Sequence, residues 1–139
     1  MKKLKMGMVG GGQGSFIGDV HRRASRIDGM IDLVCGAFSS NPERSLKSAE
    51  ALGVAPERAY KSFEDMIKKE AELPEDERMD FVSIVTPNHM HFPPAKMALE
   101  YGFHVICDKP VTLSLEEAFD LQKVVKESGK VFALTHNYT

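Results

Sequence analysis

A glycine-rich segment, residues 10–18, is the first place where residue types and spacing indicate chemistry. It follows an apolar run and reads GGGQGSFIG. Glycines let a backbone turn tightly and come close to a pyrophosphate, whose charge is then met by free amides at the start of the following helix. The residues expected at such a ligand are Gly10, Gly12, Gln13, Gly14, Ser15 and Phe16.

The spacing departs from the dinucleotide-binding fingerprint Gly-x-Gly-x-x-Gly. Gly10 and Gly12 fit it, but Ser15 stands at the sixth position and the next glycine is Gly18. We therefore expect an enlarged loop in which Gly18 packs the helix against the strand. A flexible turn without a ligand is the alternative.

Hydroxyls and a guanidinium follow the second apolar run. Enzymes that select the unphosphorylated dinucleotide usually carry an acid here, which binds the ribose hydroxyls. This chain instead reads Phe38-Ser39-Ser40-Asn41, with Arg44 one turn later. These polar side chains suit a 2′-phosphate, so the pattern favours NADP over NAD and leaves both open. The alternative makes Asn41 a helix cap and Arg44 a solvated charge.

Histidines offer a weaker signal. His89 and His91 are spaced as metal ligands can be, but no cysteine or carboxylate at ligand spacing completes the set, so we expect no metal site. His91 is expected to cap the next helix and to lie at the cofactor. His21 shares an apolar helical face with Ile17 and Ala24, which predicts a packed, hydrogen-bonded histidine rather than a catalyst.

Composition argues against several classes of partner. The 139 residues have room for one domain, and a net charge of -2 gives no reason to bind nucleic acid or anionic lipid. No apolar run approaches the roughly 20 residues that cross a bilayer. Cys35 and Cys107 lie in apolar runs, without the spacing of a disulfide framework or a zinc site. A cytoplasmic protein with a small-molecule partner fits best.

Short apolar runs alternate with amphipathic stretches along the whole chain. Because the runs are continuous rather than alternating with polar residues, they indicate parallel strands that are covered on both faces. The expected strands are residues 4–9, 31–38, 81–85, 103–107 and 131–134, with a weaker sixth at 58–60. Strand and helix alternation predicts an α/β fold, an open doubly wound (Rossmann) sheet of six mostly parallel strands with helices on both faces.

The clearest helix covers residues 115–128. Ser114 and Glu117 form a capping box, Gly129 follows the last turn, and one face carries Leu115, Ala118, Phe119 and Val125. Further helices are expected from Asn41-Pro42 to Gly53, from Ser62 onward, over residues 93–101, and over residues 18–28. The last of these is expected to bury Ile17, Val20, Ala24 and Ile27, and the acidic stretch 70–78 to form a solvated loop.

Four motifs together resemble one family. Val9-Gly10-x-Gly12 with Gly18-Asp19-Val20-His21, then Thr86-Pro87-Asn88-His89-Met90-His91, Asp108-Lys109-Pro110 and Thr135-His136-Asn137-Tyr138 follow in order. The chain is similar throughout to the amino-terminal half of the glucose-fructose oxidoreductase, inositol dehydrogenase and MocA family. That resemblance implies hydride transfer between a sugar- or polyol-like alcohol and a nicotinamide dinucleotide.

The resemblance also implies roles for single residues. Lys109 is expected to contact the substrate hydroxyl and to take part in proton transfer; without the resemblance it reads as an ordinary surface lysine. The family has glutamate where this chain has Asp108. Thr86, Pro87 and Asn88 are expected to form a wall beside the nicotinamide and its ribose. Asp108, Pro110 and Asn137 are expected near the same end of the cofactor.

Members of the family carry a second domain after the nucleotide-binding half, which supplies most of the substrate pocket and the oligomer contacts. We therefore expect residues 1–139 to be the NAD(P)-binding domain of a longer, homo-oligomeric parent. A non-catalytic dinucleotide-binding or sensory module is the alternative, and a domain that serves only assembly is a third.

Overall fold

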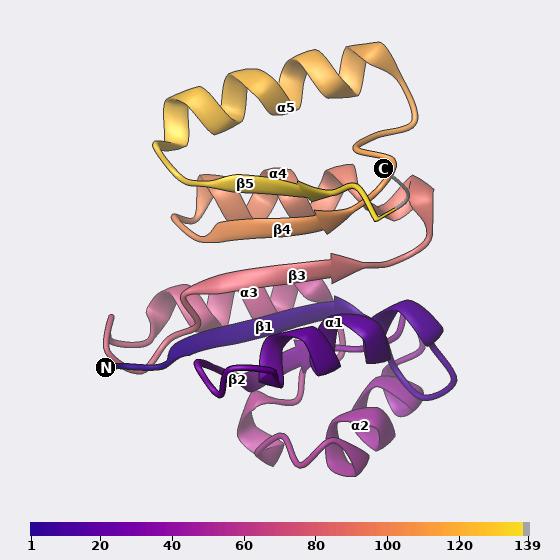
Figure 1. Ribbon diagram of the computed structural model, residues 1–139, viewed down its shortest axis with the longest axis vertical. Helices are drawn as coiled ribbons and strands as arrows, with labels where there is room; N and C mark the ends of the chain where they lie inside the picture. The colour runs from indigo at the N-terminus through magenta and orange to yellow at the C-terminus, as the bar shows by residue number, and fades with distance from the viewer. Residues whose placement is uncertain (138–139) are drawn as a thin grey trace.

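The apolar runs form one parallel sheet. The computed structural model describes residues 1–137, so Tyr138 of the last motif lies outside the described residues. The strands are β1 (Leu4–Gly10), β2 (Ile31–Ala37), β3 (Phe81–Val85), β4 (His104–Asp108) and β5 (Phe132–Thr135). They lie in the order β2-β1-β3-β4-β5, and each neighbouring pair is parallel (Figure 1). The predicted doubly wound α/β class is confirmed.

The sixth predicted strand is wrong. Residues 56–58 form a short 3₁₀ helix, η1 (Pro56–Arg58), and only a single bridge joins Ala59 to Gly36. Pro56 starts a turn rather than a strand, because it has no amide to donate to a sheet. The described part of the chain therefore contains a sheet of five strands.

Caps in the sequence set the helix starts. The helices are α1 (Phe16–Arg26), α2 (Pro42–Ala51), α3 (Phe63–Glu72), α4 (Phe92–Glu100) and α5 (Leu115–Ser128), with a second short 3₁₀ helix, η2 (Asn88–Met90). The side chains of Ser15, Asn41, Ser62 and Ser114 each accept the amide three residues on. Gly129 ends α5 in the left-handed conformation, so the predicted bounds of α5 are confirmed.

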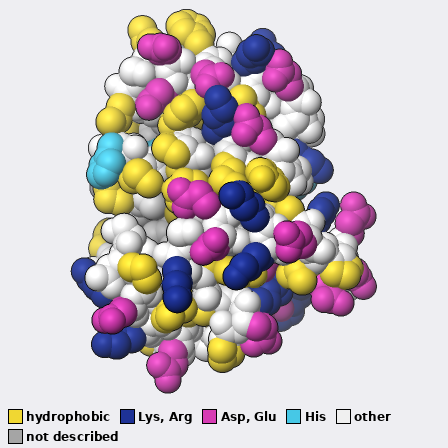
Figure 2. Space-filling model, turned by 180° about the vertical axis from the view of Figure 1, so that it is seen from behind, with side chains coloured by type: hydrophobic (Ala, Val, Ile, Leu, Met, Phe, Trp, Pro, Cys, Tyr) yellow, Lys and Arg dark blue, Asp and Glu magenta, His cyan; other side chains and the backbone are white. Residues whose placement is uncertain are grey.

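The helices cover the two faces of the sheet unequally. Figure 1 shows α1 in front of β1 and β2, with α3 and α4 behind the sheet. The larger core lies between the sheet and the helices behind it, where Ile67, Leu99 and Leu121 pack against Val82 and Val105. From behind, acidic and basic side chains are interspersed over the surface (Figure 2). Among the described residues, no helix is both long and apolar enough to cross a bilayer.

The predicted buried stripe of α1 is wrong. Val20, Ala24 and Ile27 are exposed, Ile27 to 86%, whereas Gly18, Arg22 and Ser25 are buried. The helix turns its small and polar side to the glycine loop because only Gly18 allows the close approach there. Its apolar side borders a hollow of about 370 Å³ on the front of the sheet, which we call the α1 hollow. The lining of the α1 hollow includes Val20, His21, Ala24, Phe81, Ser83, Ile106, Asp108 and Asn137.

The predicted face of α5 is also rotated. Leu115 and Phe119 are exposed, and the buried positions are Leu121 and Val124. An amphipathic pattern predicts a helix, but the neighbouring α4 decides which side is covered.

The acidic stretch 70–78 is not wholly a solvated loop. Glu70 lies inside α3 and is 0% exposed. Its carboxylate accepts two hydrogen bonds from Arg58 at 2.9 and 2.5 Å, one from the Tyr60 hydroxyl at 3.0 Å, and one from the Met79 amide at 2.9 Å. Burial and the neighbouring carboxylate raise the pKa of Tyr60. The prediction failed here because these four donors come from two other segments, residues 58–60 and Met79.

Candidate functional site

The loop after β1 has a backbone that only glycine fits. Gly10, Gly11 and Gly14 have φ angles of +79°, +74° and +82°. A Cβ atom on Gly12 would stand 2.8 Å from the carbonyl oxygen of Phe38, while one on Gly14 would meet open space. The loop is thus close-packed at Gly12 and open to a ligand at Gly14.

Gly18 packs α1 against this loop, as the sequence predicts. A Cβ atom there would lie 2.4 Å from the Cα of Gly11. The buried Arg22, one turn later, donates from Nη1 to the Gly11 carbonyl oxygen at 2.5 Å. Burial lowers the pKa of Arg22. Sequence reasoning missed this arginine, although its spacing of four from Gly18 places it on the same side of the helix.

The start of α1 presents backbone amides. The Ser15 hydroxyl accepts the Gly18 amide at 3.2 Å, and the Ser48 hydroxyl of α2 accepts the Gln13 amide at 3.1 Å. The amides of Phe16 and Ile17, in the first turn of α1, have no acceptor within the helix. Together with the positive end of the helix dipole, they favour an anion above the loop.

A groove of about 690 Å³ runs along this edge of the sheet. Ten of the predicted cofactor residues line it: Gly10, Gly12, Gln13, Gly14, Ser15, Ser39, Ser40, Arg44, Thr86 and Pro87. Sequence reasoning did not assign several further lining side chains to the cofactor, among them Ser48, Lys61, Phe63, Glu64 and His89. Lys61 and Phe63 lie in the segment after η1 and belong to no sequence motif. They reach the groove because the fold brings that segment beside the end of β2.

The other predicted cofactor residues do not line the groove. Phe16 is 82% exposed and does not plug the loop. Asn88 lies in η2, outside the groove lining. Asn41 caps α2: its side chain accepts the Arg44 amide at 3.0 Å and its own amide donates to the Ser39 hydroxyl at 3.1 Å. The capping alternative for Asn41 is therefore confirmed.

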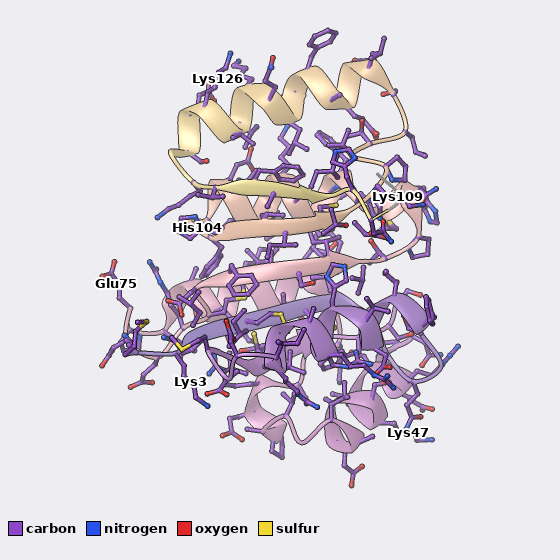
Figure 3. The ribbon with its side chains drawn as sticks, in the orientation of Figure 1. Lys3, Lys47, Glu75, His104, Lys109 and Lys126 are labelled. Carbon is purple, nitrogen blue, oxygen red and sulfur yellow. The ribbon has the colours of Figure 1, made fainter. Side chains whose placement is uncertain are left out.

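Lys109 lies at the same edge of the sheet. Figure 3 shows it beyond the end of β4, at the edge to which the strands point. The side chain is exposed, and its peptide bond to Pro110 is cis. The preceding Asp108 accepts a hydrogen bond from the Thr135 hydroxyl of β5 at 2.8 Å. The carboxylate is thus held toward the α1 hollow, which Asn137 also lines.

His91 is the N-cap residue of α4, as predicted, but it caps through its backbone. Its side chain makes no capping hydrogen bond. The ring is 1% exposed, and its nitrogens contact the carbonyl oxygens of Pro110 and Thr86 at 2.6 and 3.0 Å. The Thr86 hydroxyl donates to the Met90 carbonyl at 2.8 Å. The ring does not cap α4 with its side chain because its two nitrogens face these carbonyl oxygens instead of the amides at the start of the helix.

The hydrogen bond predicted for His21 is confirmed, although the side chain lines the α1 hollow instead of packing in the core. Its Nδ1 is hydrogen-bonded to the Ser83 hydroxyl at 2.8 Å, and desolvation lowers its pKa while nearby Asp108 partly opposes that effect. Both cysteines are buried and unpaired, and burial raises the pKa of Cys107 to about 12. Within residues 1–137, no three His, Cys, Asp or Glu side chains gather as metal ligands would.

The groove fits a dinucleotide in its shape and its donors. Close-packed glycines let the main chain approach a diphosphate, the groove reaches Ser15 at the start of α1, and hydroxyls and a guanidinium lie at the end of β2. The profile of a family described as "Oxidoreductase family, NAD-binding Rossmann fold" matches residues 4–136. The chain belongs to this family.

Solved structures of other proteins agree with that assignment. An oxidoreductase from Sinorhizobium meliloti is 48% identical with a TM-score of 0.93, and the match covers 100% of this chain and 38% of that one. An inositol dehydrogenase homologue from Azotobacter vinelandii, complexed with NADH and myo-inositol, is 38% identical with a TM-score of 0.91, covering 96% and 35%.

A curated relative shows the same partial coverage. The levoglucosan dehydrogenase of Pseudarthrobacter phenanthrenivorans is 30% identical over 99% of this chain and 34% of its own length. The chain thus spans between 34% and 38% of the length of these three family members.

Proposed function

We propose that this chain is the cofactor-binding half of an oxidoreductase that transfers hydride between a sugar- or polyol-like alcohol and a nicotinamide dinucleotide. The observation that carries the proposal is the open glycine loop at the start of α1, with Lys109 at the same edge of the sheet. The polyol and sugar substrates named for the Azotobacter and Pseudarthrobacter relatives support the substrate class.

Each part of the groove has a task in this proposal. The amides of Phe16 and Ile17 bind the diphosphate, together with the turn at Gly14. The adenosine lies toward the end of β2, and the nicotinamide ribose toward Thr86 and Pro87. A parallel sheet brings these segments together because all its strands end at one edge.

Lys109 acts on the alcohol. The bound nicotinamide accepts or returns the hydride, and the protein must move the hydroxyl proton. The exposed Lys109 ammonium stands at the carboxyl edge, where it contacts the substrate oxygen and takes part in that proton transfer. Asp108 is one methylene shorter than the glutamate of the family, and the Thr135 hydroxyl fixes its orientation. Asn88, Pro110 and Asn137 contribute at the nicotinamide end.

The same groove favours the phosphorylated cofactor. No acid follows β2 at residues 38–41, and the hydroxyls of Ser39 and Ser40 lie in a groove that Arg44 and Lys61 also line. A 2′-phosphate gains charge-assisted hydrogen bonds from such groups. Glu64 lines the groove as well and opposes this preference, so we propose a preference for NADP rather than exclusion of NAD.

The remaining expectations concern the parent protein. We propose a second domain after this one, which completes the substrate pocket and joins subunits into a homo-oligomer. The lengths of the relatives support it. Two buried, unpaired cysteines suit a reducing cytoplasm.

One pair of variants tests dinucleotide binding. Gly14 and Gly29 both have positive φ angles and open space where a side chain would go, so aspartate strains both positions alike. Only Gly14→Asp adds negative charge at the diphosphate, and we expect it to weaken reduced-cofactor binding at least about tenfold. Cofactor fluorescence and anisotropy give the dissociation constants.

The control is Gly29→Asp, at the turn after α1, which should bind like the unmodified chain. No binding by the unmodified chain, or equal binding by both variants, would count against the proposed function.

A further inference from the structure

The His91 ring lies between two segments of the proposed site. One is the end of β3, where Thr86 begins the wall beside the nicotinamide; the other is the turn after β4, where Pro110 follows Lys109. Nδ1 lies 2.6 Å from the Pro110 carbonyl oxygen and Nε2 lies 3.0 Å from the Thr86 carbonyl oxygen. A single side chain thus spans the distance between the two segments.

The chemistry of these contacts shows what the ring supplies. Both partners are carbonyl oxygens, which only accept hydrogen bonds, so the ring can act toward them only as a donor. The side chain is 1% exposed, so both contacts lie inside the protein. An unpaired buried carbonyl is costly, and loss of the ring therefore loosens both segments.

The contacts do not serve the helix that carries the residue. His91 joins α4 through its backbone, whose carbonyl accepts the Ala95 amide at 3.2 Å. The side chain instead points away from α4 to two other segments. Thr86 is tied a second time, because its hydroxyl donates to the Met90 carbonyl. The wall segment is therefore anchored at both its backbone and its side chain.

We propose that His91 is a positioning residue: its buried ring, in contact with the carbonyl oxygens of Thr86 and Pro110, fixes the Thr86–Pro87 wall relative to Lys109 and so sets the distance between the nicotinamide and the lysine. This inference rests on the proposed function. His91 touches neither cofactor nor substrate; it acts through the two carbonyl groups that it holds.

The test separates the two halves of the cofactor. ADP carries the adenosine and diphosphate but lacks both the nicotinamide and its ribose, so it binds without contacting the wall. In His91→Phe, which removes both ring contacts, we expect reduced cofactor to bind about tenfold more weakly and ADP to change less than about twofold. A merely structural role predicts equal losses for both ligands.

Two further variants restore one bond each. The amide of asparagine occupies the place of Nδ1 and that of glutamine the place of Nε2. His91→Asn keeps the donor toward Pro110 and His91→Gln the donor toward Thr86. Both should recover part of the affinity for reduced cofactor, with losses of about threefold.

His104 provides the control. Its Nδ1 also contacts a backbone group, the Val131 amide at 2.9 Å, at the opposite end of β4 from Lys109 (Figure 3). His104→Phe therefore removes a histidine-to-backbone bond far from the site. It should leave the ratio of the two dissociation constants unchanged, even if the melting temperature falls.

Two outcomes would count against the role of His91. A His91 series that weakens both ligands alike, or neither, would overturn the inference. Failure of the unmodified chain to bind either ligand would instead overturn the proposed function.

Discussion

At the scale of single residues, the end of β2 decides which nicotinamide dinucleotide is preferred. Arg44 is exposed in the first turn of α2, and Lys61 lies across the same groove. Neither is part of an ion pair within the described part of the chain. A phosphate group therefore does not have to displace an internal carboxylate from either cation.

Replacing Arg44 tests this preference. We expect Arg44→Ala to weaken NADPH binding about tenfold and NADH binding less than about twofold, because only NADPH carries the 2′-phosphate. Lys61→Ala should act in the same direction. Dissociation constants for both cofactors, measured at one fixed salt concentration, check the result.

The matched control lies on the same helix. Lys47 is an exposed cation of α2 outside the groove lining, and Figure 3 labels it on α2, at the lower right. Lys47→Ala should change neither constant. If Arg44→Ala weakened the two cofactors equally, the preference for NADP would have another origin.

At the scale of the elements, buried Glu70 holds α3 to η1 and to the segment that leads into β3. Its carboxylate accepts hydrogen bonds from Arg58, Tyr60 and the Met79 amide. The segment after η1 also provides Lys61 and Phe63 to the groove. Glu70 is therefore a structural residue that fixes one wall of the site from inside.

Removing the Glu70 charge tests this role. Glu70→Gln keeps the shape but leaves the Arg58 guanidinium without its partner, and we expect the free energy of unfolding to fall by about 2 kcal/mol. Urea denaturation measures it. The control is Glu75→Gln, since Glu75 is exposed and its contact with Arg78 is 3.5 Å long. Similar losses in both variants would show that burial of Glu70 adds no stability.

Local signals predicted much of the architecture. Asn41, Ser62 and Ser114 placed the starts of three helices, because each side chain accepts an amide three residues on in its own helix. Gly129 placed the end of α5 through its left-handed conformation. The cap Ser15 was not predicted, so the first helix starts at Phe16 and not at residue 18. The glycine loop could also be predicted from the sequence. A glycine at position 18 indicates that a helix packs closely on the loop, and Gly18 indeed packs on Gly11.

Signals that depend on distant partners were not readable. The bonds of Glu70 and of His91 join segments that lie far apart in sequence. The stripe of Val20 and Ile27 looked like a buried face, because an apolar pattern does not specify what covers it. The weak run at residues 58–60 was wrongly predicted as a strand for a related reason. The Tyr60 hydroxyl donates a hydrogen bond to the Glu70 carboxylate, a partner that the local sequence does not indicate.

At the scale of the whole molecule, one edge of the sheet gathers the chemistry. The loops after β1, β2, β3 and β4 meet there, and they carry the glycine loop, the Ser39–Arg44 segment, Thr86 and Lys109 (Figures 1 and 3). The α1 hollow on the front of the sheet is a second concave region, about 370 Å³ in volume. The central claim is that the diphosphate of a dinucleotide binds in the first region and not in the second.

Backbone amide NMR during titration with reduced cofactor tests that claim most directly. We expect the amides of residues 12–17 to shift first and most, with smaller changes after β3, because the diphosphate bonds to the loop itself. Shifts confined to the α1 hollow around Phe81 and Ile106, with the glycine loop unchanged, would contradict it.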